Sequence, residues 1–283
     1  MARVEVKICG VRDPGALDAA TEAEADWVGF VFFPPSPRHL TPPQAAALAA
    51  RAPSWLGRVG LLVEPADADV AAVLGAVALD ALQVYASAAR VAELRARFGL
   101  PIWHAIGVST AADLPAEARS ADRLVLEAQP PGDATRPGGN AARFDWSLLR
   151  DWTPPAPWLL AGGLTPENVA GAIRETGARA VDVSSGVETA RGVKDAGLIR
   201  TFIAAARSVA PSPNPLRKGK SLFLLPLPLR EGVGGRGNNP LTPCPSSPEP
   251  PPTRGAASPP RRAAPRPPRT RPARARGSLG RTG

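Results

Sequence analysis

The sequence predicts an α/β protein whose main domain is a (β/α)8 TIM barrel, and three observations lead to this prediction. Eight short β-rich runs alternate with helix-like stretches over residues 1–207. Most of these runs are continuously apolar, which is typical of parallel strands covered on both faces. Glycine- and serine-rich turns follow the last two runs, where barrels of this class bind phosphate. A doubly wound open sheet is the structural alternative.

The expected strands are short and rich in β-branched and aromatic residues. They cover residues 4–9, 27–32, 59–63, 81–85, 102–106, 124–128, 158–161 and 180–183. The stretches between the strands carry helix signals, which gives eight strand-helix units at the lower end of the size range of the fold, with the sixth connection the weakest of them.

Several expected helices begin at a recognisable cap. Asp13, Thr41 and Thr165 each precede a proline, the combination that favours an N-cap followed by the first helical position. Apolar residues at helical spacing predict the last helix, namely Leu198, Phe202, Ile203 and Ala206. Residues 129–140 follow the sixth strand and are rich in proline and glycine, so we expect a mobile active-site loop there.

The chain changes composition sharply after residue 207. Residues 208–283 contain 14 Lys and Arg against two Glu, and they hold 18 of the 35 prolines. The first 207 residues contain 20 basic and 23 acidic side chains, so the formal net charge of +9 comes from the other segment. A segment of this composition cannot bury a core. We expect residues 208–283 to be a disordered, basic, Pro-rich extension of the barrel.

Two interpretations of the extension stay open. It is cationic enough to contact nucleic acid, but it lacks interleaved aromatic residues for base stacking, so nucleic acid is not the expected partner. The PLPLREGVGGRG stretch favours a non-functional extension or translation past the normal stop.

Simple counts exclude several classes of protein. Two cysteines, Cys9 and Cys244, cannot form a disulfide framework or a four-cysteine zinc site. No apolar run reaches about 18 residues, and the N-terminus lacks the features of a secretory signal. A cytoplasmic protein without a membrane partner is the expectation.

Two side chains at predicted strand ends could transfer protons. Cys9 shares its strand parity with Glu5 and Lys7, so its thiol is expected to face the lumen at the mouth of the barrel. A nearby Lys7 ammonium is expected to favour the thiolate, a base or nucleophile. Glu127 ends the sixth strand and could be a general acid if burial raised its pKa. The alternatives are a small buried thiol without a role and a solvated loop carboxylate.

The strongest local signals predict an anion site. Gly162 and Gly163 follow the seventh strand, and Ser184 and Ser185 follow the eighth. Glycines allow close approach of the backbone, and free amides and hydroxyls bind an anion. The alternative is two ordinary tight turns. Arg38, in the loop after the second strand, is a candidate cation at the mouth.

Together these residues resemble the phosphoribosylanthranilate isomerase family from about residue 4 to residue 206. The motifs that carry the resemblance are KICG (7–10), GFVFFPPSPR (29–38), FDWSLL (144–149), AGGLTPENV (161–169), VDVSSGVE (181–188) and GVKD (192–195). Another sugar-phosphate barrel enzyme, such as an epimerase, shares the phosphate turns but not KICG or FDWSLL.

The resemblance implies an isomerase of tryptophan biosynthesis that opens a phosphorylated ribose ring in an Amadori rearrangement. It implies Cys9 as general base and places Glu127 at the position of the general acid. The other implied roles are phosphate binding by Gly162, Gly163, Ser184 and Ser185, contact with the anthranilate side by Arg38 and Asp182, and a ligand contact by Gln83. A phosphorylated small-molecule substrate, no metal or cofactor, and a monomer or homodimer are also implied.

Three residues depart from the family pattern near the mouth. Glu127 stands where the family has aspartate, Tyr85 where it has histidine, and Ala141 where a glycine is usual. A misplacement on the ångström scale can cost about a hundredfold in rate. A barrel of this family that binds its ligand with weak or lost turnover is therefore the alternative function. The two histidines, His39 and His104, offer no metal-ligand spacing, and His104 is expected to be packed and hydrogen-bonded.

Overall fold

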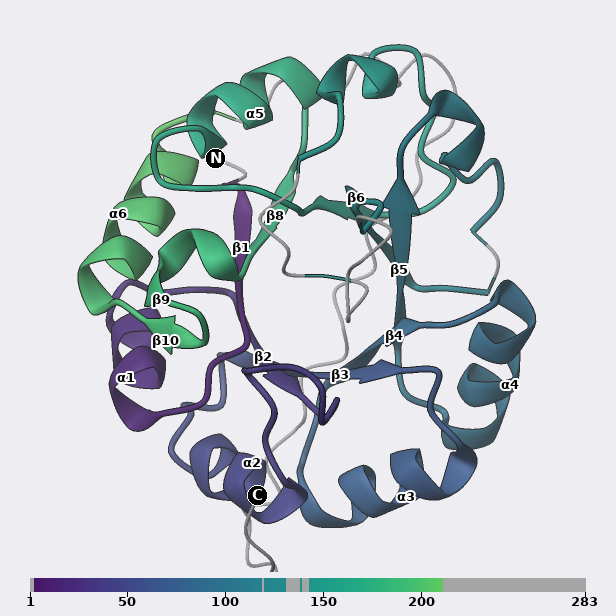
Figure 1. Ribbon diagram of the computed structural model, residues 1–283, viewed down its shortest axis with the longest axis vertical. Coiled ribbons are helices and arrows are strands. Elements are labelled where there is room, and N and C mark those ends of the chain that lie inside the picture. Colours follow the sequence, from purple (N-terminus) through teal and green to yellow (C-terminus); the bar gives the residue numbers. More distant parts are fainter. Residues whose placement is uncertain (1–2, 119, 131–137, 139–142, 211–283) are drawn as a thin grey trace, which may run out of the picture. The chain divides into compact units, whose positions relative to one another are not determined.

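Eight parallel strands form one closed barrel in the computed structural model, which describes residues 3–118, 120–130, 138 and 143–210. Figure 1 shows the ring of strands with helices outside it. The strands are β1 (Glu5–Cys9), β2 (Trp27–Val31), β3 (Gly57–Val63), β4 (Ala81–Tyr85), β5 (Ile102–Val108), β6 (Arg123–Ala128), β7 (Trp158–Leu160) and β8 (Ala180–Val183). Since β1 pairs with β8 in parallel, the predicted TIM barrel is confirmed and the open sheet is wrong.

Helices follow six of the eight strands. They are α1 (Pro14–Glu22), α2 (Pro42–Ala49), α3 (Asp67–Ala76), α4 (Ala88–Phe98), α5 (Val169–Thr176) and α6 (Ala196–Arg207). Two connections differ from the others, the one after β5, where a helix was expected, and the one after β6, where a loop was expected over residues 129–140. Their described parts contain only short 3-10 helices, η1 (Ala111–Asp113) after β5 and η2 (Trp146–Leu149) after β6.

Two of the three predicted helix caps are present. The Asp13 carboxylate accepts a hydrogen bond from the Ala16 amide at 2.9 Å, and Thr41 forms a capping box with Gln44. Thr165 was predicted as the third cap, and this was wrong. The Thr165 amide donates to Oδ1 of Asn168 at 2.8 Å, and α5 begins only after this turn.

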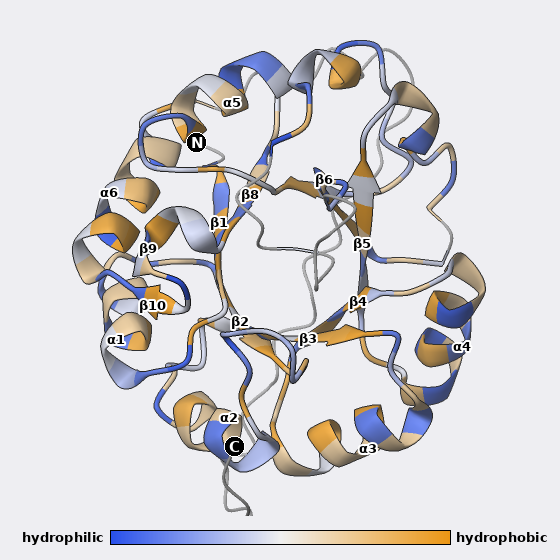
Figure 2. Ribbon diagram, in the orientation of Figure 1, coloured by the Kyte–Doolittle hydropathy of each residue, from blue (hydrophilic) through white to orange (hydrophobic). Residues whose placement is uncertain are grey.

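The apolar face of α6 covers the outside of the barrel as its spacing predicts. Phe202 and Ala206 have no exposed surface and Ile203 is 2% exposed, whereas Leu198 is partly buried. Figure 2 shows hydrophobic and hydrophilic residues on different sides of the helices around the ring. Packing between the helices and the outer faces of the strands makes up the larger core cluster.

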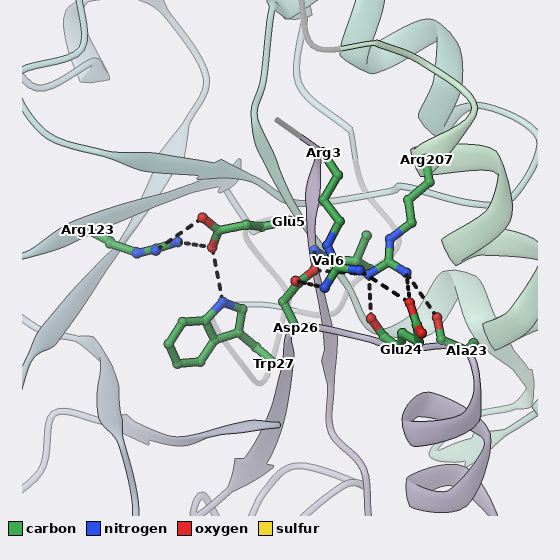
Figure 3. A network of polar contacts seen from close by, with 9 residues as sticks. All are labelled: Arg3, Glu5, Val6, Ala23, Glu24, Asp26, Trp27, Arg123 and Arg207. Carbon is green, nitrogen blue, oxygen red and sulfur yellow. Dashed lines mark hydrogen bonds and ion pairs between the residues drawn. The ribbon is translucent and has the colours of Figure 1, made fainter. Parts of the chain in front are cut away.

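Aromatic side chains fill the lumen at the N-terminal ends of the strands. The rings of Trp27 and Trp103 meet edge to face with centroids 4.9 Å apart, and the Arg123 guanidinium lies over both. Glu5 accepts hydrogen bonds from Arg123 at 2.7 Å and from the Trp27 indole at 3.1 Å (Figure 3). These contacts fix the floor below the C-terminal mouth.

A polar network at the same end ties α6 to the start of the barrel. Asp26 accepts from the Val6 amide at 2.8 Å and forms ion pairs with Arg3 and Arg207 (Figure 3). Arg207 also donates to the Ala23 carbonyl at 3.2 Å. The last helix of the barrel is thereby attached to the first two strands.

Two expectations fall outside the part of the chain that is described. They are the disordered extension, of which only residues 208–210 are included, and most of the 129–140 loop. No helix among the described residues is long and apolar enough to cross a membrane.

Phe202→Ala should lower the free energy of unfolding by about 3–5 kcal/mol, because a fully buried aromatic ring is removed from between α6 and the sheet. Arg200→Ala on the exposed side of the same helix is the control. Its ion pair with Glu22 is half-exposed, so the loss should stay below about 1 kcal/mol. Chemical denaturation of the full chain measures both values. Equal small losses would contradict the placement of α6.

Candidate active site

A cavity opens at the C-terminal ends of the strands, and it gathers most of the candidate residues. Eight of the nine predicted site residues line it, namely Cys9, Arg38, Glu127, Gly162, Gly163, Asp182, Ser184 and Ser185. The ninth, Gln83, lies in the wall of the lumen and is 1% exposed. The sequence therefore predicted which side chains come together, although they are spread over more than 170 residues.

Lys7 is a fully buried cation on β1. Its ammonium donates to Oε1 of Gln83 at 2.8 Å and to Oδ1 of Asp182 at 3.0 Å. Burial lowers the pKa of Lys7, but the carboxylate of Asp182 and the thiol of Cys9 more than offset it, so the pKa is raised overall. Lys7 stays charged because it is paired and hydrogen-bonded on both sides. Gln83 and Asp182 thus contact Lys7 directly.

The Cys9 thiol lies beside this ammonium. A methyl group at Gly29 would lie 3.0 Å from Sγ of Cys9 and 3.3 Å from Cε of Lys7, so the two side chains pass over the same glycine. Burial raises the pKa of Cys9, and the positive charge of Lys7 offsets only part of this increase. The charge of Lys7 favours the thiolate, as the sequence predicted, but burial outweighs this effect and the pKa of Cys9 is raised overall.

Glu127 is the buried carboxyl group of the site. It lies on β6 and is 6% exposed. Burial raises its pKa from 4.5 to about 8, a Tyr85 hydrogen bond lowers it, and Asp182 adds to the increase. Oε1 has no hydrogen-bond partner among the described residues. A carboxyl group with this pKa carries a proton at neutral pH, as a general acid must.

The turn after β7 presents its backbone to the cavity. Gly162 and Gly163 both have positive φ, at 80° and 63°, a conformation that side-chain-bearing residues rarely adopt. Asn168 fastens this turn, because its Nδ2 donates to the Gly163 carbonyl at 2.9 Å while its Oδ1 binds the Thr165 amide. Asn168 was not predicted. Its position three residues after Thr165 in the sequence was the signal from which this turn could have been predicted.

The turn after β8 is held against β1. The Ser184 hydroxyl donates to the Cys9 carbonyl at 3.2 Å, and Ser185 begins the short 3-10 helix η3 (Ser185–Val187). Both turns border the cavity from adjacent strands. The arrangement fits an anion that receives backbone and hydroxyl hydrogen bonds.

Arg38 is clamped by a carboxylate that the sequence did not single out. Its Nε and Nη2 donate to the two carboxyl oxygens of Glu188 at 2.7 and 2.8 Å. Lys194 binds the same carboxylate at 2.8 Å and the Ser184 carbonyl at 2.9 Å. Hydrogen bonds from Arg38 and the charge of Lys194 outweigh burial and lower the pKa of Glu188 to about 2.

Glu188 and Lys194 lie on a short hairpin, β9 (Glu188–Ala190) and β10 (Val193–Lys194), between η3 and α6. Glu188 belongs to the VDVSSGVE motif and Lys194 to the GVKD motif. The two motifs therefore contained the residues that hold Arg38, although the sequence analysis did not assign them a role. Three cations around the cavity, Lys7, Arg38 and Lys194, are paired with only two carboxylates, Asp182 and Glu188. The third carboxyl group, that of Glu127, is neutral at pH 7. The buried charges thus leave an excess positive charge at the mouth.

His104, Tyr85 and Ala141 are the remaining residues that the sequence analysis singled out. His104 is 4% exposed and its Nε2 lies 2.9 Å from the Ala86 carbonyl, which confirms its packed, hydrogen-bonded role. Among the described residues, no three His, Cys, Asp or Glu side chains are grouped as metal ligands. Tyr85 borders the cavity, whereas Ala141 lies outside the described residues.

Comparison with known proteins gives one consistent result. A profile of the family described as N-(5'phosphoribosyl)anthranilate (PRA) isomerase matches residues 6–205. The N-(5'-phosphoribosyl)anthranilate isomerase of Acidiphilium cryptum is 54% identical over 208 residues, which cover 74% of this chain and 100% of the relative.

Solved structures of similar proteins share the barrel. The dimeric phosphoribosylanthranilate isomerase of Thermotoga maritima, crystallised as monomers, is 32% identical with a TM-score of 0.62. A phosphoribosylanthranilate isomerase in complex with reduced 1-(o-carboxyphenylamino)-1-deoxyribulose 5-phosphate has the same identity and TM-score, 32% and 0.62. Each alignment covers 73% of this chain and 100% of the other.

Glu188→Gln should destabilise the barrel, because Arg38 and Lys194 then face each other as unpaired buried cations. The pKa of Glu188 is lowered from 4.5 to about 2, so its stabilisation is fully present above pH 4.5 and is lost as the pH falls toward 2. The difference in unfolding free energy between parent and variant should shrink by about 2 kcal/mol over that window. Urea denaturation at several pH values measures it, and a constant difference would contradict the ion pairs.

Proposed function

Because the chain belongs to the N-(5'-phosphoribosyl)anthranilate isomerase family, we propose that Cys9 and Glu127 perform its isomerisation at the mouth of the barrel. The enzyme is an isomerase of tryptophan biosynthesis. It converts N-(5-phosphoribosyl)anthranilate to 1-(2-carboxyphenylamino)-1-deoxyribulose 5-phosphate. The observation that carries the assignment of roles is a neutral buried carboxyl group in the same cavity as a thiol held beside a buried ammonium.

Glu127 acts in the ring-opening step. It donates its proton to the ribose ring oxygen while the C1–O bond breaks, and the lone pair of the anthranilate nitrogen forms the C1=N bond of a Schiff base. Its pKa of about 8 supports this role, since the group is protonated at neutral pH and still acidic enough to release the proton.

Cys9 acts in the following step. Its thiolate removes the proton from C2, and the electrons of the C2–H bond neutralise the Schiff base to give an enol-amine. The enol-amine becomes the ketose when C1 takes up a proton and the C2 hydroxyl releases its own proton. Lys7 and Lys194 both stabilise the thiolate electrostatically. A buried thiol with a raised pKa is also a stronger base once it is ionised. No oxidant, metal or cofactor enters these steps.

The anionic ends of the substrate have matching partners. We infer that the phosphate group lies against Gly162, Gly163, Ser184 and Ser185, where two turns present backbone and hydroxyl donors. Arg38 is the inferred partner of the anthranilate carboxylate, because Glu188 holds its guanidinium in one orientation. Asp182, which lines the cavity, is the inferred second contact of the anthranilate side, and Gln83 is the inferred further ligand contact beside Lys7. A relative that binds a phosphorylated product analogue supports this arrangement.

Three further statements are part of the proposal. The barrel of residues 1–207 is the functional domain, and residues 208–283 form a separate extension. The enzyme is located in the cytoplasm. It is a monomer or a homodimer, the second being the state named for the Thermotoga maritima relative.

The second candidate function is a barrel that binds the substrate without turning it over. It is favoured by one feature, the additional methylene that Glu127 has compared with aspartate. The position of Glu127 in the cavity lining and its raised pKa support turnover instead.

Glu127→Gln and Cys9→Ala should each lower kcat by about 10²- to 10⁴-fold, because each removes a proton-transfer group. The loss of anthranilate-type fluorescence, followed in single-turnover and steady-state assays of the full chain, measures this. Glu93→Gln on the surface of α4 is the matched control and should leave kcat unchanged.

An active Glu127→Gln variant would contradict the assignment of the acid. An inactive parent that becomes active as Glu127→Asp would support the binding barrel and contradict the proposed turnover.

A further inference from the structure

Tyr85 and Glu127 approach each other across the mouth of the barrel. Tyr85 ends β4 and Glu127 lies near the end of β6, with β5 between them. The residues of β5 at this level are small. Ala105 pairs with Val125 of β6, and Gly107 pairs with Glu127. Neither Ala105 nor Gly107 therefore places a large side chain between Tyr85 and Glu127.

Gly138 gives an independent measure of how close the two polar groups are. A methyl group at this glycine would lie 2.4 Å from the Tyr85 hydroxyl and 2.7 and 2.8 Å from the two carboxyl oxygens of Glu127. All three oxygen atoms thus surround one point in the cavity wall. The hydroxyl of Tyr85 donates a hydrogen bond to the Glu127 carboxyl group.

The other charged groups that face Glu127 come from the remaining sides of the cavity. Asp182 on β8 raises the pKa of Glu127, and Lys7 on β1 lowers it. These two groups pair with each other. Cys9 on β1 and Arg38 after β2 also line the cavity. Of these residues, Tyr85 has the largest specific effect on the carboxyl group.

We propose that Tyr85 is a positioning residue for the general acid, whose hydroxyl holds the flexible Glu127 carboxyl group in the cavity wall while Oε1 has no hydrogen-bond partner among the described residues. Glutamate has one more rotatable bond than aspartate, so its carboxyl group needs such a partner to stay in one place. Tyr85 does not touch the reacting atoms itself. This inference rests on the proposed role of Glu127.

The hydrogen bond makes a specific prediction for the pH profile. Tyr85 stabilises the ionised form of Glu127, so loss of the hydroxyl moves the pKa of Glu127 further above about 8. The enzyme loses activity when Glu127 gives up its proton. The alkaline limb of kcat/KM, which reports groups of the free enzyme, should therefore move to higher pH.

Tyr85→Phe in the full chain is the decisive variant, because it keeps the ring and removes only the hydroxyl. We expect kcat to fall about tenfold to a hundredfold and the alkaline limb to move up by about one pH unit. If Tyr85 only packed against its neighbours, Tyr85→Phe would leave the alkaline limb of kcat/KM at the pH of the parent.

A double-mutant cycle with Glu127→Asp adds a second readout. The shorter carboxylate withdraws from the Tyr85 hydroxyl, so Tyr85→Phe should change kcat by less than about twofold in the Glu127→Asp background. Equal effects in both backgrounds would overturn the proposal. An unmoved alkaline limb in Tyr85→Phe would overturn it as well, whatever the change in kcat.

Failure of the underlying assignment has a different signature. If Glu127→Gln keeps both its activity and the alkaline limb, Glu127 is not the acid, and the proposed function fails together with this inference. If Glu127→Gln loses activity while Tyr85→Phe behaves as the parent, only the role of Tyr85 is overturned.

Discussion

The buried ammonium of Lys7 is the interaction on which the site depends. A cation without solvent contact is tolerable only if it is paired and hydrogen-bonded, and Lys7 obtains both from β4 and β8 through Gln83 and Asp182. This requirement fixes three strands of the barrel relative to one another at the level just below the mouth. It also places one positive charge beside Cys9, where it favours the thiolate of a side chain that otherwise packs against Val31 and Leu61.

The environments of the acid and the base differ in a way that suits two opposite proton transfers. Glu127 lies where burial dominates, so it retains its proton at neutral pH. Cys9 is also buried, but cations on β1 and β10 reduce the free energy of ionising its thiol. Arg38, held by Glu188, adds a positive charge on a third side. A substrate with a phosphate and a carboxylate then supplies the negative charge that the cavity lacks.

Much of this arrangement could be predicted from residue patterns, because parallel strands buried on both faces have a distinctive composition. All eight strands lie within two residues of their expected bounds, and strand parity placed Cys9 in the lumen. Contacts that depend on three-dimensional proximity could not be predicted. Glu188 and Asn168 act on residues far away or across a turn, and the pKa of Cys9 depends on how burial compares with the charge of Lys7.

The protonation state of Glu127 is the decisive quantity, because the proposed ring opening requires a neutral carboxyl group in the same cavity as the base. Carbon-13 NMR of the glutamate carboxyl groups, recorded against pH and assigned with Glu127→Gln, measures it in the full chain. We expect one carboxyl group that titrates at about 8 and is absent from the variant. A Glu127 signal that titrates near the ordinary glutamate value of 4.5 would contradict it.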